Sequence, residues 1–352
     1  MSEGTAAGVV RGYLSDNAAG ASPEIAAAMT EAAVGLASPC GSDDVSKRVG
    51  ARMAEVFEHP VDVFPVGTGS AANGIALATL TPPWGSILSH PDGHIANDEA
   101  GTPEFFTHGA KITLVDGPNS KITPEALRAA AVYRRGNLHS VQPSVASLTQ
   151  AAETGSVYTV AEIHELSEIA HEAGLRVHMD GARLANALVA LEATPAEMTW
   201  QAGVDVLSFG ATKNGAMTAD AIVSFDPSLR TELSYRHKRG GQLTSKMWFQ
   251  SAQLDAYLTD DLWLRNARHA NGMAERLRAR LALHPEIEML GDPRANIVFC
   301  SFPPMLIDGL HGRGFAFHAD RWGPGVVHLV TSFAHQPEDI DVLLAAVADI
   351  LG

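Results

Sequence analysis

The sequence predicts an α/β fold in which a mostly parallel sheet is sandwiched between helices and a smaller α+β domain follows. Two observations predict it. Over roughly the first 230 residues, short apolar segments typical of strands alternate with Ala-rich segments typical of helices. Beyond that point come long helical segments, two further strand-like segments and a closing helix. The 352 residues are 46% hydrophobic, which is enough for two cores.

The strand-like segments of the first part are short apolar runs, most of them followed by a helical segment. Because neighbouring parallel strands need a crossover, this order predicts a parallel sheet with helices on both faces. Ligands bind such sheets at the carboxyl ends of the strands. The predicted strands cover residues 61–67, 86–90, 111–116, 144–150, 176–180, 204–210 and 221–226.

Three parts are expected along the chain. Residues 1–235 form an N-terminal arm and a large domain, residues 236–265 a connecting helix, and residues 266–352 the small C-terminal domain. In the small domain we expect strands within residues 295–302 and 326–333 and a helix over residues 338–351.

The charge of the chain argues against polyanionic partners. Lys and Arg number 25 against 40 Asp and Glu, a formal net charge of −15, so neither nucleic acid nor an anionic membrane is an expected partner. No apolar run approaches the roughly 18 residues of a membrane span, and the first residues lack a signal-peptide core. We therefore expect a cytoplasmic protein. Cys40 and Cys300 are too few for a disulfide framework or a Cys-type zinc site.

Lys213 is the only cation in "SFGATKNG", directly after a predicted strand. Burial lowers the pKa of a lysine and makes it a candidate for a Schiff base with a carbonyl. The alternative is a strand-end lysine whose ammonium reaches water.

Asp180 ends the predicted strand "RVHMD". A buried carboxylate needs a partner. It could keep the nitrogen of a pyridine ring protonated, so that the ring withdraws electrons, or it could form a salt bridge with Arg183. His178 and Asp180 also resemble a metal-binding pair, but no third ligand has a convincing spacing, and we expect no metal.

The segment "PVGTGSAANG" (65–74) predicts a strand, a Gly-rich turn and a helix start. Free backbone N–H groups and the positive end of the helix dipole suit a phosphate there, with Gly69 and the Ser70 hydroxyl as donors. The pattern is not G-x-G-x-x-G, so a dinucleotide site is a poor fit. A tight structural turn is the plain alternative.

Two histidines lie in predicted loops near strand ends. His94 could stack its ring on a flat cofactor, and His139 lies in another loop before a strand. Each taken alone is explained as well by a structural role.

Together, these features resemble the low-specificity L-threonine aldolases among the fold-type I pyridoxal phosphate enzymes. The resemblance covers nearly the whole chain. It is carried by "SDNAAGASPEI" (15–25), "GTGSAAN" (67–73), "HIANDEAGTPEFF" (94–106), "QAAETGSVY" (150–158), "HMDGARLANA" (178–187), "AGVDVLSFGATKNG" (202–215) and "GGQLTSKM" (240–247).

The resemblance implies pyridoxal 5'-phosphate as cofactor and a role for each matching residue. Lys213 would form the Schiff base with the cofactor, Asp180 would pair with its ring nitrogen, and His94 would stack on the ring. Arg183 would lie near the ring oxygen and the substrate carboxylate, which Ser15 would also reach. His139 would face the β-hydroxyl of the substrate. Gly69 and Ser70 would form the turn that binds the phosphate.

The family also implies a homo-oligomer, a dimer or tetramer with active sites at the subunit interface. Lys246, or Arg239 in its place, would bring a cation to the phosphate from the neighbouring subunit.

The chain departs from the family pattern at His328. Relatives usually carry there an arginine that clamps the substrate carboxylate. An imidazole offers fewer donors and titrates near pH 6.5 when unperturbed. We expect a cationic His328 at lower pH, with Arg321 or Arg313 as alternative clamps.

The expected activity is cleavage of L-threonine, L-allo-threonine and related β-hydroxy-α-amino acids to glycine and an aldehyde, and the reverse synthesis. Transaldolase, β-eliminating lyase or aminotransferase activity on a related amino acid is the alternative that keeps the cofactor. A cofactor-binding protein without useful catalysis is a further one.

Overall fold

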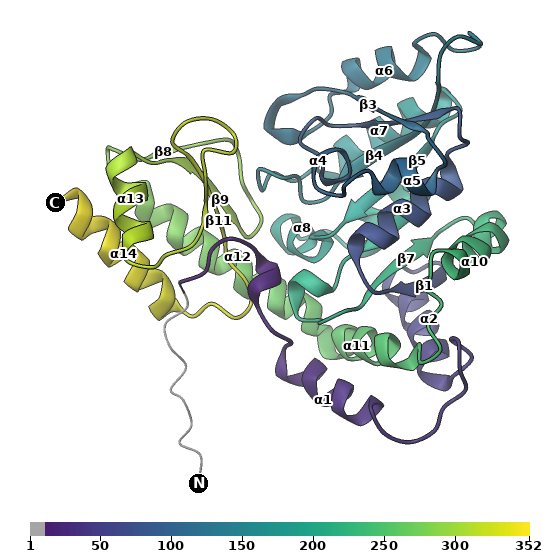
Figure 1. The fold of residues 1–352 in the computed structure, drawn as a ribbon, viewed down its shortest axis with the longest axis horizontal. Coiled ribbons are helices and arrows are strands. Elements are labelled where there is room, and N and C mark those ends of the chain that lie inside the picture. The colour runs from purple at the N-terminus through teal and green to yellow at the C-terminus, as the bar shows by residue number, and fades with distance from the viewer. Residues whose placement is uncertain (1–10) are drawn as a thin grey trace.

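The computed structural model describes residues 11–352 and contains two sheets, one in each of two bodies (Figure 1). Residues 1–10, the beginning of the predicted N-terminal arm, lie outside the described part. The larger body holds a seven-stranded sheet and the smaller body a four-stranded one.

The large sheet has the strand order β1-β7-β6-β5-β4-β2-β3. Five neighbouring strands, from β6 to β3, are parallel, whereas β7 runs antiparallel to both of its neighbours. The predicted mostly parallel sheet is therefore confirmed. Its strands are β1 (Asp62–Val66), β2 (Gly85–Ser89), β3 (Lys111–Leu114), β4 (Gln142–Thr149), β5 (Arg176–Gly181), β6 (Val206–Phe209) and β7 (Asp220–Ser224).

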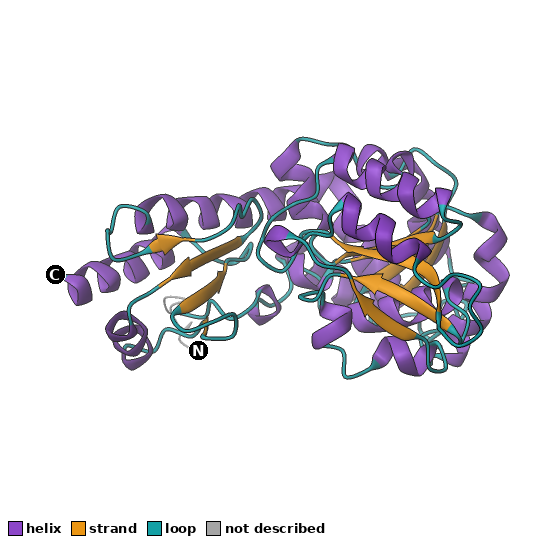
Figure 2. Cartoon of the chain, turned by 90° about the horizontal axis from the view of Figure 1, so that it is seen from above, coloured by secondary structure: helices purple, strands orange, loops and turns teal. Residues whose placement is uncertain are grey.

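Helices cover both faces of this sheet (Figure 2). Successive strand residues point to opposite faces, so Ile87 and Leu88 belong to two different hydrophobic clusters. One face packs against α3 (Gly69–Leu80) and α10 (Arg230–Arg239). The other face packs against α2 (Asp44–Val56), α6 (Pro124–Val132), α7 (Val160–Glu172), α8 (Leu184–Leu191) and α11 (Trp248–Leu258). The shorter peripheral helices are α1 (Pro23–Ala32), α4 (His94–Asn97), α5 (Thr102–Phe106) and α9 (Pro195–Met198).

The small body is an antiparallel sheet with helices packed on it. Its strand order is β10-β11-β9-β8, and the two long strands lie within the predicted segments. Its elements are β8 (Glu288–Met289), β9 (Ile297–Ser301), α13 (Pro304–Gly312), β10 (His318–Ala319), β11 (Val326–Val330) and α14 (Pro337–Leu351).

Helix α12 (Leu262–Leu281) belongs to both bodies (Figure 1). Its first turns bury Trp263 in the core of the large body, and its last turns bury Leu277 in the core of the small one. The segment 236–265 expected to be one connecting helix holds the end of α10, a loop, α11 and the start of α12. The three-part division of the chain stays a prediction.

The N-terminal arm crosses from the small body to the large one. Tyr13 is fully buried in the small core, donates from its N–H to the Ala316 carbonyl at 2.6 Å and accepts from the Val330 N–H at 2.9 Å. The arm then turns through a short helix at residues 16–18 and enters α1, which packs on α11. The small sheet therefore fixes where the arm enters the large body.

No helix within residues 11–352 combines the length and apolar character that crossing a membrane requires.

Gly210, just beyond β6, lies against the backbone that follows β5. A Cβ at this position would lie 2.6 Å from the Ala182 carbonyl oxygen and 2.7 Å from its Cα. Backbone atoms cannot move aside as a side chain does, so Gly210→Ala is expected to lower the free energy of unfolding by about 1–3 kcal/mol.

The matched control is Gly272→Ala on α12, where an added Cβ meets nothing within 4 Å. A helical Gly→Ala change stabilises by about 0.5–1 kcal/mol. Urea denaturation of both variants measures the difference. Equal stabilities would show that β5 and β6 can separate at their carboxyl ends without cost.

Candidate active site

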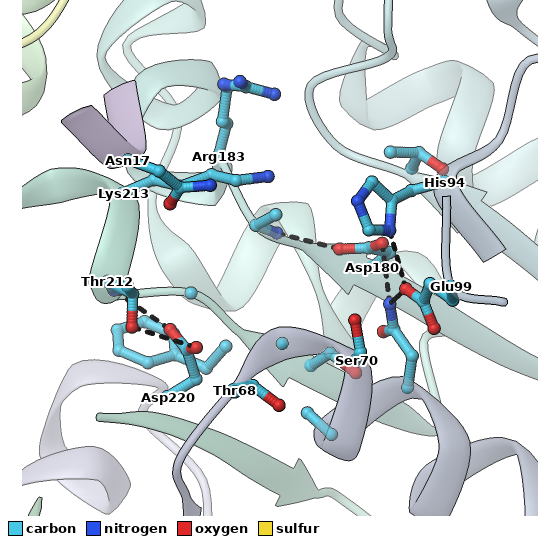
Figure 3. A pocket seen from close by; sticks show the side chains of 18 of the residues that line it. Asn17, Thr68, Ser70, His94, Glu99, Asp180, Arg183, Thr212, Lys213 and Asp220 are labelled. Carbon is cyan, nitrogen blue, oxygen red and sulfur yellow. Dashed lines mark hydrogen bonds and ion pairs between the residues drawn. The ribbon is translucent and has the colours of Figure 1, made fainter. Parts of the chain in front are cut away.

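One cavity of about 480 Å³ opens at the carboxyl ends of the central strands (Figure 3). This volume lies within the usual range of small-molecule sites, about 300–1,000 Å³. The β1–α3 turn, the end of β5 and the segment between β6 and β7 form its walls, as expected for a sheet of this topology.

Lys213 and Asp180 both line this cavity. Lys213 lies in η4 (Thr212–Asn214), and its ammonium makes no hydrogen bond or ion pair within the described chain. Asp180 is 4% exposed and accepts from the Asn73 amide at 2.9 Å and from the Ala182 N–H at 3.1 Å. The cavity therefore presents an unpaired amine together with a carboxylate that is held in place.

A chain of hydrogen bonds runs from Asp180 to His94 (Figure 3). The Asn73 amide bonds both Asp180 and the Glu99 carboxylate, the latter at 2.8 Å. Glu99 in turn lies 2.8 Å from His94 Nδ1. This hydrogen bond raises the pKa of His94 above its ordinary value, although burial opposes it.

Arg183 pairs with Asp16 of the N-terminal arm rather than with Asp180. Its Nε lies 2.8 Å from one carboxylate oxygen and its Nη2 3.1 Å from the other. The Asn296 amide also donates to Asp16, at 3.0 Å. Burial opposes ionisation, yet the charges of Arg183 and Lys213 hold the pKa of Asp16 below its ordinary value. The alternative role for Asp180, a salt bridge with Arg183, is therefore wrong.

The turn between β1 and α3 exposes the helix N-terminus to the cavity. Thr68 caps the helix, because its hydroxyl accepts from the Ala71 N–H at 3.1 Å, and Gly69 and Ser70 line the cavity as predicted. Gln242 holds the turn from outside by accepting from the Gly67 N–H at 2.9 Å.

Asp220 closes the floor beside this turn. It accepts from the Ala211 and Thr212 amides at 2.7 and 3.0 Å and from the Thr212 hydroxyl at 3.1 Å. Burial is the largest influence on this carboxyl and raises its pKa.

Ser15 is near the cavity but does not line it. Its hydroxyl accepts from the Asn17 N–H at 3.1 Å and so caps the short helix of the arm. Asn17 is the arm residue that faces the cavity.

His139 does not reach this cavity, contrary to the expectation for a residue that faces the substrate. It is exposed in the turn before β4, at the amino ends of the strands, and lines a different hollow with Tyr133 and Lys111. Within one chain, a loop that precedes a parallel strand lies at the opposite edge from the site. Because the family implies active sites at a subunit interface, the role of His139 facing the substrate stays a prediction.

His328 is buried and uncharged. Burial, the charge of Arg183 and then that of His318 lower its pKa to about 3, although it has a hydrogen bond to the backbone of Glu153. The expected cationic imidazole is therefore corrected, since a group with this pKa stays neutral at every pH near 7. Its Nδ1 has no hydrogen-bond partner in the described chain.

The other predicted cations lie outside the cavity. Lys246 and Arg239 are exposed, and Lys246 lines a groove beside Trp248, so their role across an interface stays a prediction. Arg321 forms an ion pair with Asp98 at 2.5 Å. Arg313 bonds Asp349 on the far side of the small body.

Metal binding finds no support at His178. Its two ring nitrogens lie 2.9 Å from the Ser147 hydroxyl and 3.0 Å from that of Ser208, and burial lowers its pKa to about 4. No group of three or more His, Cys, Asp or Glu side chains within residues 11–352 is arranged to hold a metal ion.

Sequence reasoning missed several residues of the cavity. Glu99 and Asn73 lie inside motifs that carry the family resemblance. Nothing in their spacing along the sequence indicates that their side chains form a hydrogen bond with each other. Glu153 also lines the cavity, from the segment after β4. Glu153 follows β4, the neighbour of the strand that carries Asp180. This position could have indicated that it lies in the cavity.

Comparison with known proteins decides the family. A profile of the β-eliminating lyase family matches residues 13–301. A low-specificity L-threonine aldolase of a Pseudomonas species is 40% identical over 306 residues, which cover 87% of this chain and 88% of the relative. The corresponding protein of Pseudomonas aeruginosa matches equally well. The chain belongs to the low-specificity L-threonine aldolases.

Solved structures agree on the fold. The threonine aldolase of Leishmania major superposes with a TM-score of 0.91 at 24% identity, covering 97% of this chain and all of that one. Cystalysin of Treponema denticola, whose structure contains pyridoxal 5'-phosphate, has a TM-score of 0.72 at 13% identity and covers 94% and 88% of the two chains. The fold is therefore that of the fold-type I pyridoxal phosphate enzymes.

Membership in the threonine aldolases makes this chain a pyridoxal phosphate-dependent lyase. The donor set of the cavity fits that cofactor. It offers one free amine for a carbonyl, a buried carboxylate for a ring nitrogen, and a helix N-terminus for a phosphate.

The His94–Glu99 hydrogen bond generates a prediction. In Glu99→Gln the pKa of His94 should fall, because the bond that raises it loses its charge. A raised folded-state pKa adds stability below the ordinary histidine value, and this is lost as pH rises through the raised one. The stability difference between wild type and variant should therefore be largest at acidic pH and shrink above neutrality.

NMR titration of the imidazole and thermal midpoints across pH measure both effects. Glu104→Gln, which changes a glutamate of α5 that forms no hydrogen bond with His94 within the described residues, is the control. An unchanged His94 titration in Glu99→Gln would contradict the assignment.

Proposed function

We propose that the protein cleaves L-threonine, L-allo-threonine and related β-hydroxy-α-amino acids to glycine and an aldehyde, and catalyses the reverse synthesis. The observation that carries the proposal is the meeting of Lys213 and Asp180 in one cavity at the strand ends. The names of the relatives support the substrate class.

Lys213 is the residue that would hold the cofactor covalently, because its amine is unpaired and faces the cavity. Asp180 would keep a proton on the ring nitrogen, and Asn73 fixes the orientation of its carboxylate. His94 would cover one face of the ring. When bound, the cofactor supplies a ring that withdraws the electron pair released by bond cleavage.

The N-terminus of α3 would bind the phosphate through backbone N–H groups at Gly69 and Ser70 and through the side chains of Thr68 and Ser70. A cation from a second copy of the chain, Lys246 or Arg239, would complete that site. We therefore propose a homo-oligomer. Analytical ultracentrifugation tests the assembly, and the cofactor affinity of Lys246→Ala tests the cation.

Arg183 would bind the substrate carboxylate. In support, it is the only arginine that lines the cavity in the described chain. Its Nε and Nη2 are taken by Asp16, which leaves Nη1 for a ligand. Ser15 would help from the arm. We also propose a cytoplasmic location, where free amino acids are available.

A β-eliminating activity is the second candidate, favoured by the family profile that the chain matches. It would release ammonia and a keto acid from an amino acid with a leaving group at Cβ, and a coupled ammonia assay separates it from aldol cleavage.

Lys213→Ala tests the covalent role. Wild-type protein should bind pyridoxal phosphate with an absorbance band that borohydride removes, and should form acetaldehyde and glycine from L-threonine. The variant should lack the reducible band and lose nearly all cleavage, because no other lysine lines the cavity in the described chain. An intact reducible band in the variant would place the attachment elsewhere.

Asp180→Asn keeps the shape of the side chain and removes its charge. Loss of a charged partner aimed at the ring should lower kcat by about 10²–10³-fold. Cofactor retention, measured by absorbance after gel filtration, separates lost chemistry from lost binding. Turnover close to that of the wild type would show that the ring nitrogen needs no acid here.

A further inference from the structure

Cleavage of a β-hydroxy amino acid requires a group that accepts the proton of the β-hydroxyl. His139, the residue expected for this task, lies at the opposite edge of the sheet. Within one chain, the candidates for the acceptor are therefore the side chains that line the cavity.

Most of the ionisable groups that line the cavity are already engaged. His94 and Glu99 bond each other, Asp180 accepts two hydrogen bonds, and Asp220 accepts three. Arg183 pairs with Asp16, and Lys213 is reserved for the cofactor under the proposed function.

Glu153 is the carboxyl that remains. Its side chain is half-buried, lines the cavity and makes no hydrogen bond or ion pair with any residue from 11 to 352. Its charged neighbours come from three other elements: His94 from α4, Asp180 and Arg183 from the end of β5, and Lys213 from η4.

The backbone that carries Glu153 is fixed on both sides. Before it, the Gln150 N–H donates to the Asp180 carbonyl at 2.8 Å, and the Arg183 N–H donates to the Gln150 carbonyl at 3.2 Å. After it, the Gly155 carbonyl accepts from the Arg294 and Ala295 amides, at 2.8 and 3.1 Å. The loop is thus tied to the end of β5 and to the small body.

His328 supports the same loop from the small body. Its neutral imidazole hydrogen-bonds the backbone of Glu153, where a carbonyl is the acceptor that a ring N–H requires. Relatives are expected to carry an arginine at this position, whereas a neutral ring here holds the loop without adding a charge beside the carboxyl.

The electrostatics suit a proton acceptor. Burial raises the pKa of Glu153, and Asp180 adds to this, although Arg183, Lys213 and His94 act in the opposite direction. A carboxyl whose pKa moves towards the working pH is a stronger base than an ordinary glutamate and still gives up its proton afterwards.

We propose that Glu153 accepts the β-hydroxyl proton of the substrate, which makes it a catalytic residue of the aldol cleavage. The inference rests on the proposed function. As the O–H bond breaks, its electron pair forms the carbonyl bond of the aldehyde, and the pair of the broken Cα–Cβ bond stays with Cα. A proton is then taken up at Cα to give glycine, and Glu153 releases its own proton to solvent.

The test compares Glu153→Gln with Glu165→Gln, an exposed glutamate on α7 that does not line the cavity, as control. Glu153→Gln should lower kcat for L-threonine and L-allo-threonine by about 10²–10⁴-fold, the usual contribution of a general base. It should keep the cofactor band and should exchange the α-proton of glycine in D₂O within a few-fold of wild type, because glycine has no β-hydroxyl. Glu165→Gln should cleave threonine at the wild-type rate.

The pH profile separates proton transfer from a structural role. In wild type, kcat should fall as pH drops through the raised pKa of Glu153, and Glu153→Gln should lack this acidic limb. Glu153→Asp, which keeps the carboxyl but shortens its reach, should retain part of the rate with the limb at a shifted pH. If the acidic limb of the kcat profile lies at the same pH in Glu153→Asp as in wild type, the proposal is overturned. This comparison holds even if Glu153→Gln does not fold.

Two further outcomes are decisive. Cleavage by Glu153→Gln within several-fold of wild type, or an equal loss in Glu165→Gln, overturns the role of Glu153 and leaves the proposed function standing. A wild-type protein that exchanges the glycine proton but releases no aldehyde from threonine overturns the proposed function itself.

Discussion

The buried ion pair between Arg183 and Asp16 is the constraint on which the site depends. Both side chains are almost inaccessible, at 8% and 1% exposure, so neither charge could stay there alone. Asp16 comes from an arm whose Tyr13 is buried in the small body, and Arg183 follows β5 of the large one. One contact therefore joins arm, small body and sheet at the mouth of the cavity, and removing either partner would leave an uncompensated charge in the interior.

Most of the other charged groups of the cavity are held by hydrogen bonds to neighbouring residues. The side-chain amide of Asn73 donates hydrogen bonds to both Asp180 and Glu99, and Glu99 also forms a hydrogen bond with His94. Hydrogen bonds of this kind restrict the rotation of each group and leave few polar atoms free to react. Among the ionisable side chains that line the cavity, only Lys213 and Glu153 make no such bond within residues 11–352, so the reactive capacity of the site is concentrated in them.

The departure from the family pattern at His328 bears directly on Glu153. His328 replaces a cation that was expected to bind the substrate, and it hydrogen-bonds the loop of Glu153 instead. A guanidinium at the same place would lower the pKa of the neighbouring carboxyl and weaken it as a base. A neutral ring preserves the basicity, and carboxylate binding then falls to Arg183.

The sequence by itself determined the parallel sheet, its strands and the motifs around Lys213, Asp180 and Gly69, because apolar periodicity and motif spacing are local properties of the chain. It could not place His139, since which edge of the sheet a loop occupies depends on strand direction. It also assigned a charge to His328, which burial and Arg183 remove. The Asp16 partner of Arg183, 167 residues away, and the unpaired state of Glu153 were decided by tertiary structure alone. Pairing and desolvation arise only when distant segments pack together.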